Sequence, residues 1–186
     1  SQMRISLVIP TRNEAGAIGR VLKEVPKKLI YEIIVIDGHS TDGTSMEIRE
    51  ELRPKKDKFI LQKKKGFGSA LQQAFKEAQG DVIVIMNGDG SHNPEDIPAL
   101  LKKIKEGYTY VMASRYLKGG RSKDDTWVRF IGNRTFTFLT NLIHRTNVSD
   151  SLYFFTAVTR DGIKKLELKS PGFELCIEML IKAHKA

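Results

Sequence analysis

The chain has very little cysteine: Cys176 is the only one among 186 residues, so no disulfide can form within it. Such usage is typical of a protein that works in a reducing compartment. The chain also lacks an apolar run near the ~18–20 residues that span a bilayer, and nothing at its start resembles a signal peptide. None of its four histidines stands at zinc-binding spacing from the cysteine. We therefore expect a cytoplasmic globular protein without a structural zinc site.

Acidic residues are scarce relative to basic ones, with 22 Asp and Glu against 31 Lys and Arg and a net charge of +9. The excess is concentrated in residues 53–65, with seven basic residues and one acidic, and in residues 102–145, with ten and three. Such a charge favours an anionic partner: a nucleic acid, a phosphate-rich ligand or an anionic membrane surface. No nucleic-acid-binding motif accompanies the charge, so a basic nucleic-acid-binding domain is the less favoured interpretation and no nucleic acid is expected as a partner.

Short apolar runs alternate with helical patterns through the first 115 residues. Five runs are predicted to be strands: residues 4–10, 32–37, 58–62, 82–86 and 108–114. The segments between them have the apolar spacing of helices, and Asn13 is placed to cap the first of these helices. Strands that alternate with helices predict right-handed βαβ units, and therefore an α/β fold with a mainly parallel sheet.

The pattern changes after Arg115. A charged, glycine-containing loop precedes residues 126–145, an aromatic-rich segment with interleaved basic residues. A further strand pattern, LYFFTAVT, and an amphipathic helical pattern complete the sequence. No repeat, low-complexity tract or linker separates these parts, so we predict one domain over residues 3–186.

Polar clusters follow three of the predicted strands: PTRNE at 10–14, DGHSTDGT at 37–44 and NGDGSH at 87–92. Each cluster alone is compatible with ordinary turn chemistry, because Asn-Gly and Asp-Gly are strong turn formers. Parallel strands bring their carboxyl ends to one edge of the sheet, where α/β folds bind ligands. Three clusters at that edge therefore favour a binding site. By contrast, GFGSAL at 66–71 matches neither the dinucleotide-binding glycine pattern nor a P-loop.

Six segments together resemble the family-2 glycosyltransferases of the GT-A fold, and in particular the polyprenol-phosphate sugar synthases, which include dolichol-phosphate mannose synthases. The resemblance runs from Ile5 to Ala183. It rests on LVIPTRNEAGAI, EIIVIDGHSTDGT, KGFGSALQQAF, GDVIVIMNGDGSHNPED, MASRYLKGG and GFELCIEMLIKA, in this order and spacing.

This resemblance implies an inverting hexosyltransferase that uses a GDP- or UDP-linked sugar and a polyprenyl or dolichyl phosphate acceptor. It also implies a nucleotide-sugar half, residues 3–115, and an acceptor half, residues 116–186. By position in the family motifs, eight residues are expected to bind the donor: Pro10, Thr11, Arg12, Glu14, Asp37, Asn87, Gly88 and Asp89. Among them Asp37 is expected to accept N–H groups of the base, with a turn cap as the alternative role.

Asn87-Gly88-Asp89 aligns with the Asp-x-Asp motif that holds a divalent cation, Mg²⁺ or Mn²⁺, in the family. A hard cation prefers oxygen ligands and offsets the charge of a departing diphosphate. Asp89 is the expected main ligand and a catalytic residue, with Asn87 and Ser91 as further ligands. An amide at position 87 predicts weaker metal binding than in the family, and leaves a catalytically impaired nucleotide-sugar-binding relative as an alternative.

Arg115 and Arg129 match the family's arginines that hold the acceptor phosphate, a task that suits the planar guanidinium. We count both as catalytic candidates. Residues 126–145 resemble the family's interfacial helix and predict peripheral contact with the cytoplasmic face of a membrane, although plain core packing fits the pattern as well. Residues 149–155 depart from the pattern of close relatives, so a transferase acting on a non-lipid acceptor also remains open.

Overall fold

The computed structural model describes residues 2–114 and 153–185. Arg115, Arg129 and the aromatic-rich segment 126–145 lie outside the described residues. The strands within the described parts are β1 (Ile5–Thr11), β2 (Glu32–Asp37), β3 (Lys58–Leu61), β4 (Val82–Ile85), β5 (Tyr110–Met112) and β6 (Thr156–Thr159). The helices are α1 (Ile18–Glu24), α2 (Thr44–Glu51), α3 (Phe67–Glu77), the 3₁₀ turn η1 (Pro94–Asp96), α4 (Ile97–Lys105), α6 (Arg160–Leu166) and α7 (Leu175–Lys185). None of these helices is long and apolar enough to cross a membrane.

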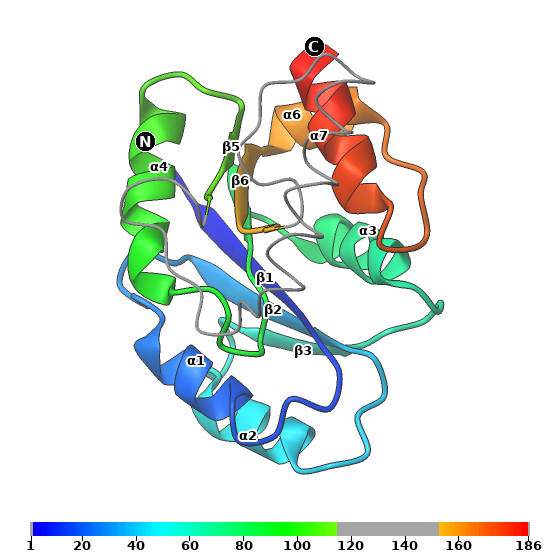
Figure 1. Ribbon diagram of the computed structural model, residues 1–186. Helices are drawn as coiled ribbons and strands as arrows, with labels where there is room; N and C mark the ends of the chain where they lie inside the picture. The colour runs from blue at the N-terminus through cyan, green and yellow to red at the C-terminus, as the bar shows by residue number, and fades with distance from the viewer. Residues whose placement is uncertain (1, 115–152, 186) are drawn as a thin grey trace, which may run out of the picture.

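The strands form one sheet in the order β3-β2-β1-β4-β6-β5 (Figure 1). β1 pairs in parallel with both β2 and β4, and β2 pairs in parallel with β3. β6 runs antiparallel to its neighbours β4 and β5. The predicted α/β fold with a mainly parallel sheet is therefore confirmed, and all five strands expected before residue 115 are present.

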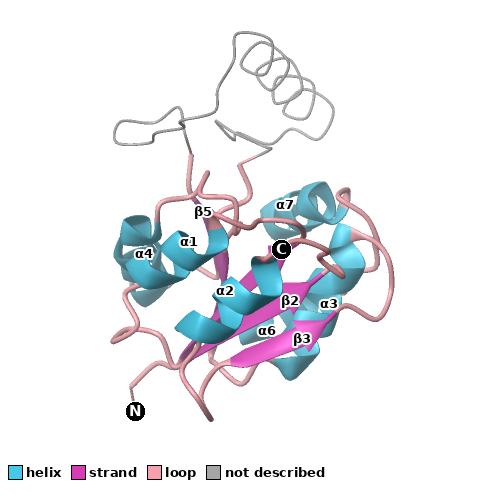
Figure 2. Cartoon of the chain, turned by 90° about the horizontal axis from the view of Figure 1, so that it is seen from below, coloured by secondary structure: helices cyan, strands magenta, loops and turns pink. Residues whose placement is uncertain are grey.

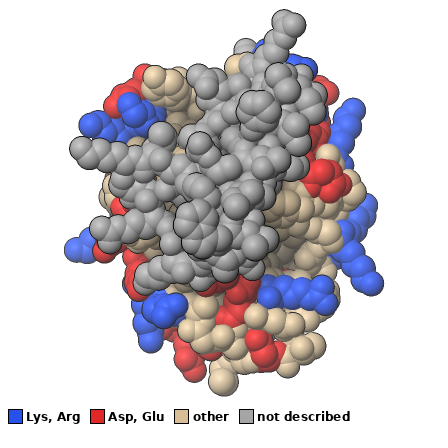
Figure 3. Space-filling view, in the orientation of Figure 1, with Lys and Arg blue, Asp and Glu red and all other residues tan. Residues whose placement is uncertain are grey.

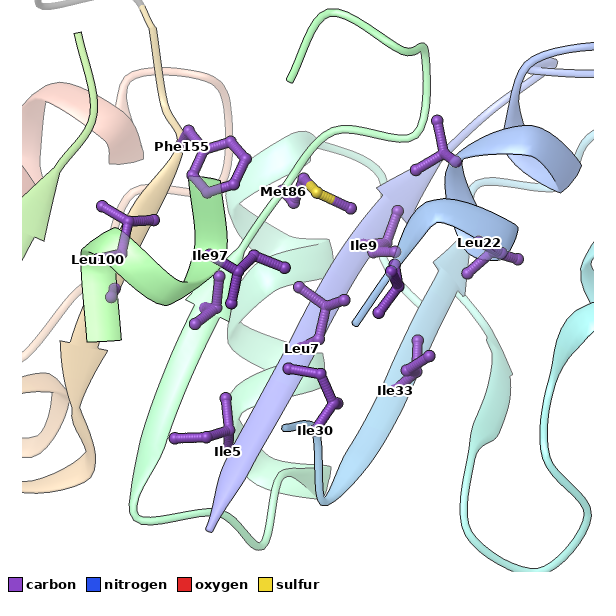
Figure 4. Close-up of a cluster of buried hydrophobic side chains, with 14 of the residues drawn as sticks. Ile5, Leu7, Ile9, Leu22, Ile30, Ile33, Met86, Ile97, Leu100 and Phe155 are labelled. Atoms are coloured by element: carbon purple, nitrogen blue, oxygen red, sulfur yellow. The ribbon is translucent and has the colours of Figure 1, made fainter. Parts of the chain in front are cut away.

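Helices cover both faces of the sheet and give three layers (Figures 1 and 2). Because successive side chains of a strand point to opposite faces, β1 feeds two cores. Leu7 and Ile9 belong to the core under α1, α2 and α4, and Val8 belongs to the core under α3, α6 and α7. Figure 4 shows part of the first core, where Leu7 and Ile9 lie near Ile33 of β2 and Leu22 of α1.

Parallel pairing brings the ends of β1, β2 and β3 to one edge of the sheet. Thr11, the last residue of β1, is paired with Asp37, the last residue of β2. Asp37 is in turn paired with Leu61, the last residue of β3. The loops that leave these three strands therefore start side by side, and β4, whose last residue Ile85 is paired with Val8 of β1, runs toward the same edge.

Candidate functional site

A pocket of about 740 Å³ lies at this carboxyl edge. It is bounded by the loops that follow β1, β2, β3 and β4 and by the start of α3. Seven of the eight predicted donor-binding residues line it: Pro10, Thr11, Arg12, Glu14, Asn87, Gly88 and Asp89. Asp37 is not part of the lining, although its neighbours Ile36 and Gly38 are. The fold thus brings two of the three polar clusters, and the edge of the third, around one space.

Asp37 is almost fully buried, and its carboxylate is engaged in the turn that follows β2. Oδ2 accepts a hydrogen bond from the Ser40 backbone nitrogen at 2.9 Å, and Oδ1 accepts one from the Ser40 hydroxyl at 2.5 Å. Each carboxylate oxygen of the buried Asp37 therefore has a hydrogen-bond donor. The side chain sets the path of Gly38 and His39, which do face the pocket.

The loops after β1 and β2 are joined directly. Asn13 adopts a left-handed backbone conformation, with φ of +52°. Its side-chain oxygen accepts from the Thr41 nitrogen at 2.8 Å, and its own nitrogen donates to the Ser40 hydroxyl at 2.8 Å. The expected capping role is therefore wrong, since α1 begins only at Ile18 with no side-chain cap. Asn13 instead fastens the two walls of the pocket together.

The loop after β4 holds its shape through two side chains of its own. Asp89 Oδ1 accepts from the Ser91 nitrogen at 2.9 Å and from the Ser91 hydroxyl at 2.6 Å. The buried His92 accepts from the Asn87 nitrogen at 3.0 Å through its Nδ1 atom. Its ring rests edge-on against Tyr153, with the centroids 4.6 Å apart. An acceptor at Nδ1 requires the ring proton to be on Nε2, which makes this imidazole neutral.

Gly88, in the middle of the Asn-Gly-Asp sequence, packs closely against core side chains. A Cβ atom at this position would lie 2.8 Å from Cδ1 of Ile18 and 3.3 Å from Cγ2 of Ile9. The turn thus sits directly on the core formed by β1 and α1. This close packing helps to position Asn87 and Asp89, which line the pocket.

Negative charge collects on one side of the pocket. The pKa of Glu14 is raised, first by partial burial and then by the nearby carboxylates of Asp89 and Asp42. A cation bound near these carboxylates would offset the repulsion between them. Asp89 is exposed to the pocket, and its Oδ2 atom makes no hydrogen bond to the described residues.

The oxygen donors of this loop suit a hard cation in kind, since the Asp89 carboxylate and the Asn87 amide oxygen are ligands that Mg²⁺ and Mn²⁺ accept. They are few in number. No group of three or more His, Cys, Asp or Glu side chains in the described parts of the chain is arranged to hold a metal ion. Ser91, the third predicted ligand, uses its hydroxyl proton on Asp89. The donor set therefore fits a cation that takes its remaining ligands from a bound anion or water.

The opposite wall of the pocket is basic and was not predicted as part of the site. Lys63, Lys64 and Lys65 line it. Their loop is fixed by Gln62, whose side-chain nitrogen donates to the carbonyls of Lys64 and Gly66 at 2.5 and 2.8 Å. The signal in the sequence was the basic stretch 53–65. In the parts of the face that Figure 3 draws in colour, Lys and Arg side chains project outward, with Asp and Glu side chains between them.

The glycines of GFGSAL allow close packing between two backbones. The nitrogens of Gly68 and Ser69, at the start of α3, donate to the carbonyls of Gly172 and Pro171 at 3.0 and 2.9 Å. A Cβ at position 68 would lie 2.2 Å from the Ser170 carbonyl oxygen. The segment 170–173 thus occupies the helix start and brings the half-exposed Phe173 into the pocket, with its ring 5.1 Å from that of Phe67.

The sequence profile of the family described as glycosyl transferase family 2 matches residues 6–167, most of the length that carries the sheet and the pocket. The chain belongs to glycosyl transferase family 2. The predicted resemblance is thereby confirmed.

Two curated relatives of this family member cover 97% of it. One, named dolichol-phosphate mannosyltransferase, is from Pyrococcus furiosus and is 33% identical. The other, named glycosyltransferase AglJ, is from Haloferax volcanii and is 29% identical. The chain spans 53% and 58% of the lengths of these two relatives, so it corresponds to about half of each.

Solved structures share the fold. The glucosyl-3-phosphoglycerate synthase of Mycobacterium tuberculosis, in complex with Mn²⁺, UDP and glucosyl-3-phosphoglycerate, superposes with a TM-score of 0.78 at 24% identity. The match covers 98% of this chain and 66% of that one. A second structure of the same synthase, with Mg²⁺ and UDP, gives the same TM-score. At this identity the likeness establishes the GT-A fold alone.

Proposed function

We propose that the protein transfers a hexose from a GDP- or UDP-linked donor, bound in the pocket at the carboxyl edge, to a polyprenyl phosphate, with inversion at the sugar. The observation that carries the proposal is the pocket itself. One wall, at Asn87 and Asp89, offers oxygen ligands for a cation. The facing wall, at Lys63–Lys65, offers positive charge for phosphates. Membership of a glycosyltransferase family supports the same reaction class.

The nucleoside is proposed to lie against Pro10, Thr11, Arg12 and Glu14 and the turn after β2, which Asp37 holds in shape through Ser40. The diphosphate then lies between the Asn87-Gly88-Asp89 turn and the basic loop. A nucleotide-sugar has the size that a pocket of about 740 Å³ accepts.

A divalent cation, Mg²⁺ or Mn²⁺, is proposed to be held by Asp89 with the amide oxygen of Asn87 and the hydroxyl of Ser91. It would supply charge neutralisation to the departing nucleoside diphosphate. Because Asn87 adds no negative charge, it cancels less of the cation's charge than a second carboxylate would, and the ammonium groups of Lys63–Lys65 add to the neutralisation. The structures of the mycobacterial synthase with Mn²⁺ or Mg²⁺ are consistent with such a cofactor.

The acceptor is proposed to be a lipid phosphate, held by Arg115 and Arg129. A phosphate is already anionic at neutral pH, so the reaction needs no general base. Catalysis then rests on positioning and electrostatics. The name of the relative at 33% identity, dolichol-phosphate mannosyltransferase, supports this acceptor. With a lipid acceptor we also propose contact with the cytoplasmic face of a membrane.

A non-lipid acceptor is the second candidate, because the synthase with the similar fold is named for a phosphoglycerate product. Both candidates share the donor site. A relative that binds nucleotide-sugar without turnover is the third candidate, favoured by the amide at Asn87.

The test measures binding first and turnover second. The melting temperature is recorded with GDP- and UDP-sugars, with and without Mn²⁺, since a ligand of the folded state raises it. Release of the nucleoside diphosphate is then measured with dolichyl phosphate and with phosphoglyceric acid as acceptors. Asp89→Asn, which keeps the shape of the side chain, should lose the Mn²⁺-dependent part of the shift. The proposal is refuted if no nucleotide-sugar raises the melting temperature. Binding of a nucleotide-sugar without release of the nucleoside diphosphate, with either acceptor, identifies the non-catalytic relative.

A further inference from the structure

A second hollow, of about 640 Å³, lies at the opposite edge of the sheet from the candidate donor pocket. It is formed where β2 and β3 begin, between the loop that precedes β2 and the loop that precedes β3. Its basic lining residues are Lys27, Lys28, Arg53, Lys55, Lys56 and Lys58. The basic stretch 53–65 is therefore split by β3: Arg53 to Lys58 face this hollow, and Lys63–Lys65 face the donor pocket.

The walls of the hollow are held by one partly buried ion pair, Arg53 with Asp57. The guanidinium of Arg53 donates to both carboxylate oxygens of Asp57, at 3.0 and 2.8 Å, and to the carbonyls of Lys27 and Ile30, at 3.1 and 3.2 Å. Asp57 also accepts from the Ile33 nitrogen at 2.8 Å, and its side chain is fully buried. Arg53 thus joins the two loops and holds the backbone on both sides of the hollow.

The lysines around it fall into two groups. Two are neutralised: Lys58 lies 3.2 Å from the buried Glu32 carboxylate, and Lys27 lies 3.6 Å from that of Glu51. The other three, Lys28, Lys55 and Lys56, are exposed and form no ion pair or side-chain hydrogen bond with the described residues. Lys55 is also held in a left-handed conformation, with φ of +64°.

The Glu32 carboxylate also lines the hollow, but it forms no ion pair with these three lysines. Glu32 is almost fully buried, and it already accepts from the Ser6 hydroxyl at 2.7 Å and from the Gln79 nitrogen at 2.6 Å while pairing with Lys58. Three ammonium groups without an ion pair to the described residues thus line one concavity. A compact anion with several negative charges would attract all three.

We propose that this hollow is a binding site for a small anion that carries two or more linked phosphate groups. A concave site lined by three lysines without ion pairs to the described residues fits a compact polyphosphate, whereas a nucleic acid or a flat membrane would require a longer basic track. The site lies at the amino ends of β2 and β3, so its occupant is a ligand separate from the donor. The hollow has the volume of a small-molecule site.

The test compares two triple variants that remove the same three positive charges. The first is Lys28→Gln, Lys55→Gln and Lys56→Gln, and the matched control is Lys102→Gln, Lys105→Gln and Lys165→Gln, three exposed lysines that line neither the hollow nor the donor pocket. Binding of inorganic phosphate, pyrophosphate and triphosphate is measured by titration calorimetry at about 0.15 M salt, where distant surface charges are screened. The melting temperature of each variant without ligand reports whether it is folded.

We expect affinity to rise from phosphate to triphosphate, and the first triple variant to weaken triphosphate binding by about tenfold or more. The control variant should keep this binding. Equal weakening in both variants would mean a diffuse effect of net charge and overturns the proposal. The proposal is also overturned if binding weakens in the control alone or in neither variant. It is overturned as well if the affinity does not change with the number of phosphate groups. The same titration with adenosine triphosphate shows whether a nucleoside adds to the affinity. Loss of binding of both triphosphate and adenosine triphosphate in the first variant supports the site.

Discussion

The Nδ1 atom of His92 lies 3.0 Å from the backbone nitrogen of Asn87, so a buried neutral imidazole closes the turn that carries Asp89. The ring is itself fixed by aromatic contacts with Tyr153 and Phe155. The candidate metal loop is therefore positioned from the core and not only by its own sequence. This explains why His92 belongs to the site without lining the pocket.

Two variants of His92 separate the hydrogen bond from the ring. His92→Phe keeps an aromatic ring but removes the acceptor, whereas His92→Asn places an amide oxygen near the position of Nδ1. Each should lower the free energy of unfolding by about 2 kcal/mol, the first through an unsatisfied nitrogen and the second through lost packing. Only the Phe variant should lose the Mn²⁺-dependent rise in melting temperature with nucleotide-sugar. Equal loss of that rise in the Asn variant would show that the acceptor does not position the loop.

Asn87→Asp restores a second carboxylate to the candidate metal turn. We expect Mn²⁺ to bind about tenfold more tightly without any nucleotide present, because a carboxylate adds charge and a stronger oxygen donor. The binding is measured from the electron paramagnetic resonance signal of unbound Mn²⁺. Asn93→Asp is the control, since it adds the same charge at a helix cap where Asp serves as well as Asn. Similar gains in both variants would assign the effect to net charge, against a site at Asn87.

The strands were predictable because each is a short apolar run between turn signals, and the edge on which the polar clusters meet follows from parallel pairing alone. The contacts that shape the pocket were not. Asn13 has the sequence context of a helix cap, yet its side chain binds Thr41 on another loop. The carboxylate of Asp37 is taken by Ser40, a local turn that competes with a ligand role. The bond between Asn13 and Thr41 cannot be inferred from periodicity, because it depends on how closely two loops approach in space. The bond between Asp37 and Ser40 is local, and it matches the turn cap that was the alternative role for Asp37.

Gly68→Ala should separate α3 from the segment 170–173. A Cβ at position 68 meets backbone atoms, with 2.2 Å to the Ser170 carbonyl oxygen, and backbone cannot move aside as a flexible side chain can. We expect the free energy of unfolding to fall by about 3 kcal/mol in chemical denaturation. Gly43→Ala is the control, because its Cβ would meet only the Ala15 side chain at 3.9 Å. A small loss at position 68, similar to that of the control, would mean that the two backbones are not in contact.

Glu178 should make the same segment sensitive to acid. Burial opposes its charge, but hydrogen bonds from Lys182, Ser170 and Lys169 outweigh burial and lower the pKa of Glu178 to about 2. A carboxylate with a lowered pKa stabilises the fold fully above its unfolded value of 4.5, and this contribution is lost as the pH falls toward about 2.

Glu178→Gln should therefore cost about 2 kcal/mol of unfolding free energy at pH 7, after allowance for solvent screening. The difference from the unmodified protein should shrink steadily between pH 4.5 and about 2, because protonation removes the same charge from both proteins. Urea denaturation over this pH range measures the difference. Glu24→Gln, an exposed glutamate without an ion pair in the described residues, controls for net charge. A difference that does not change with pH would assign the loss to packing, and Glu178 would then not hold the segment through its charge.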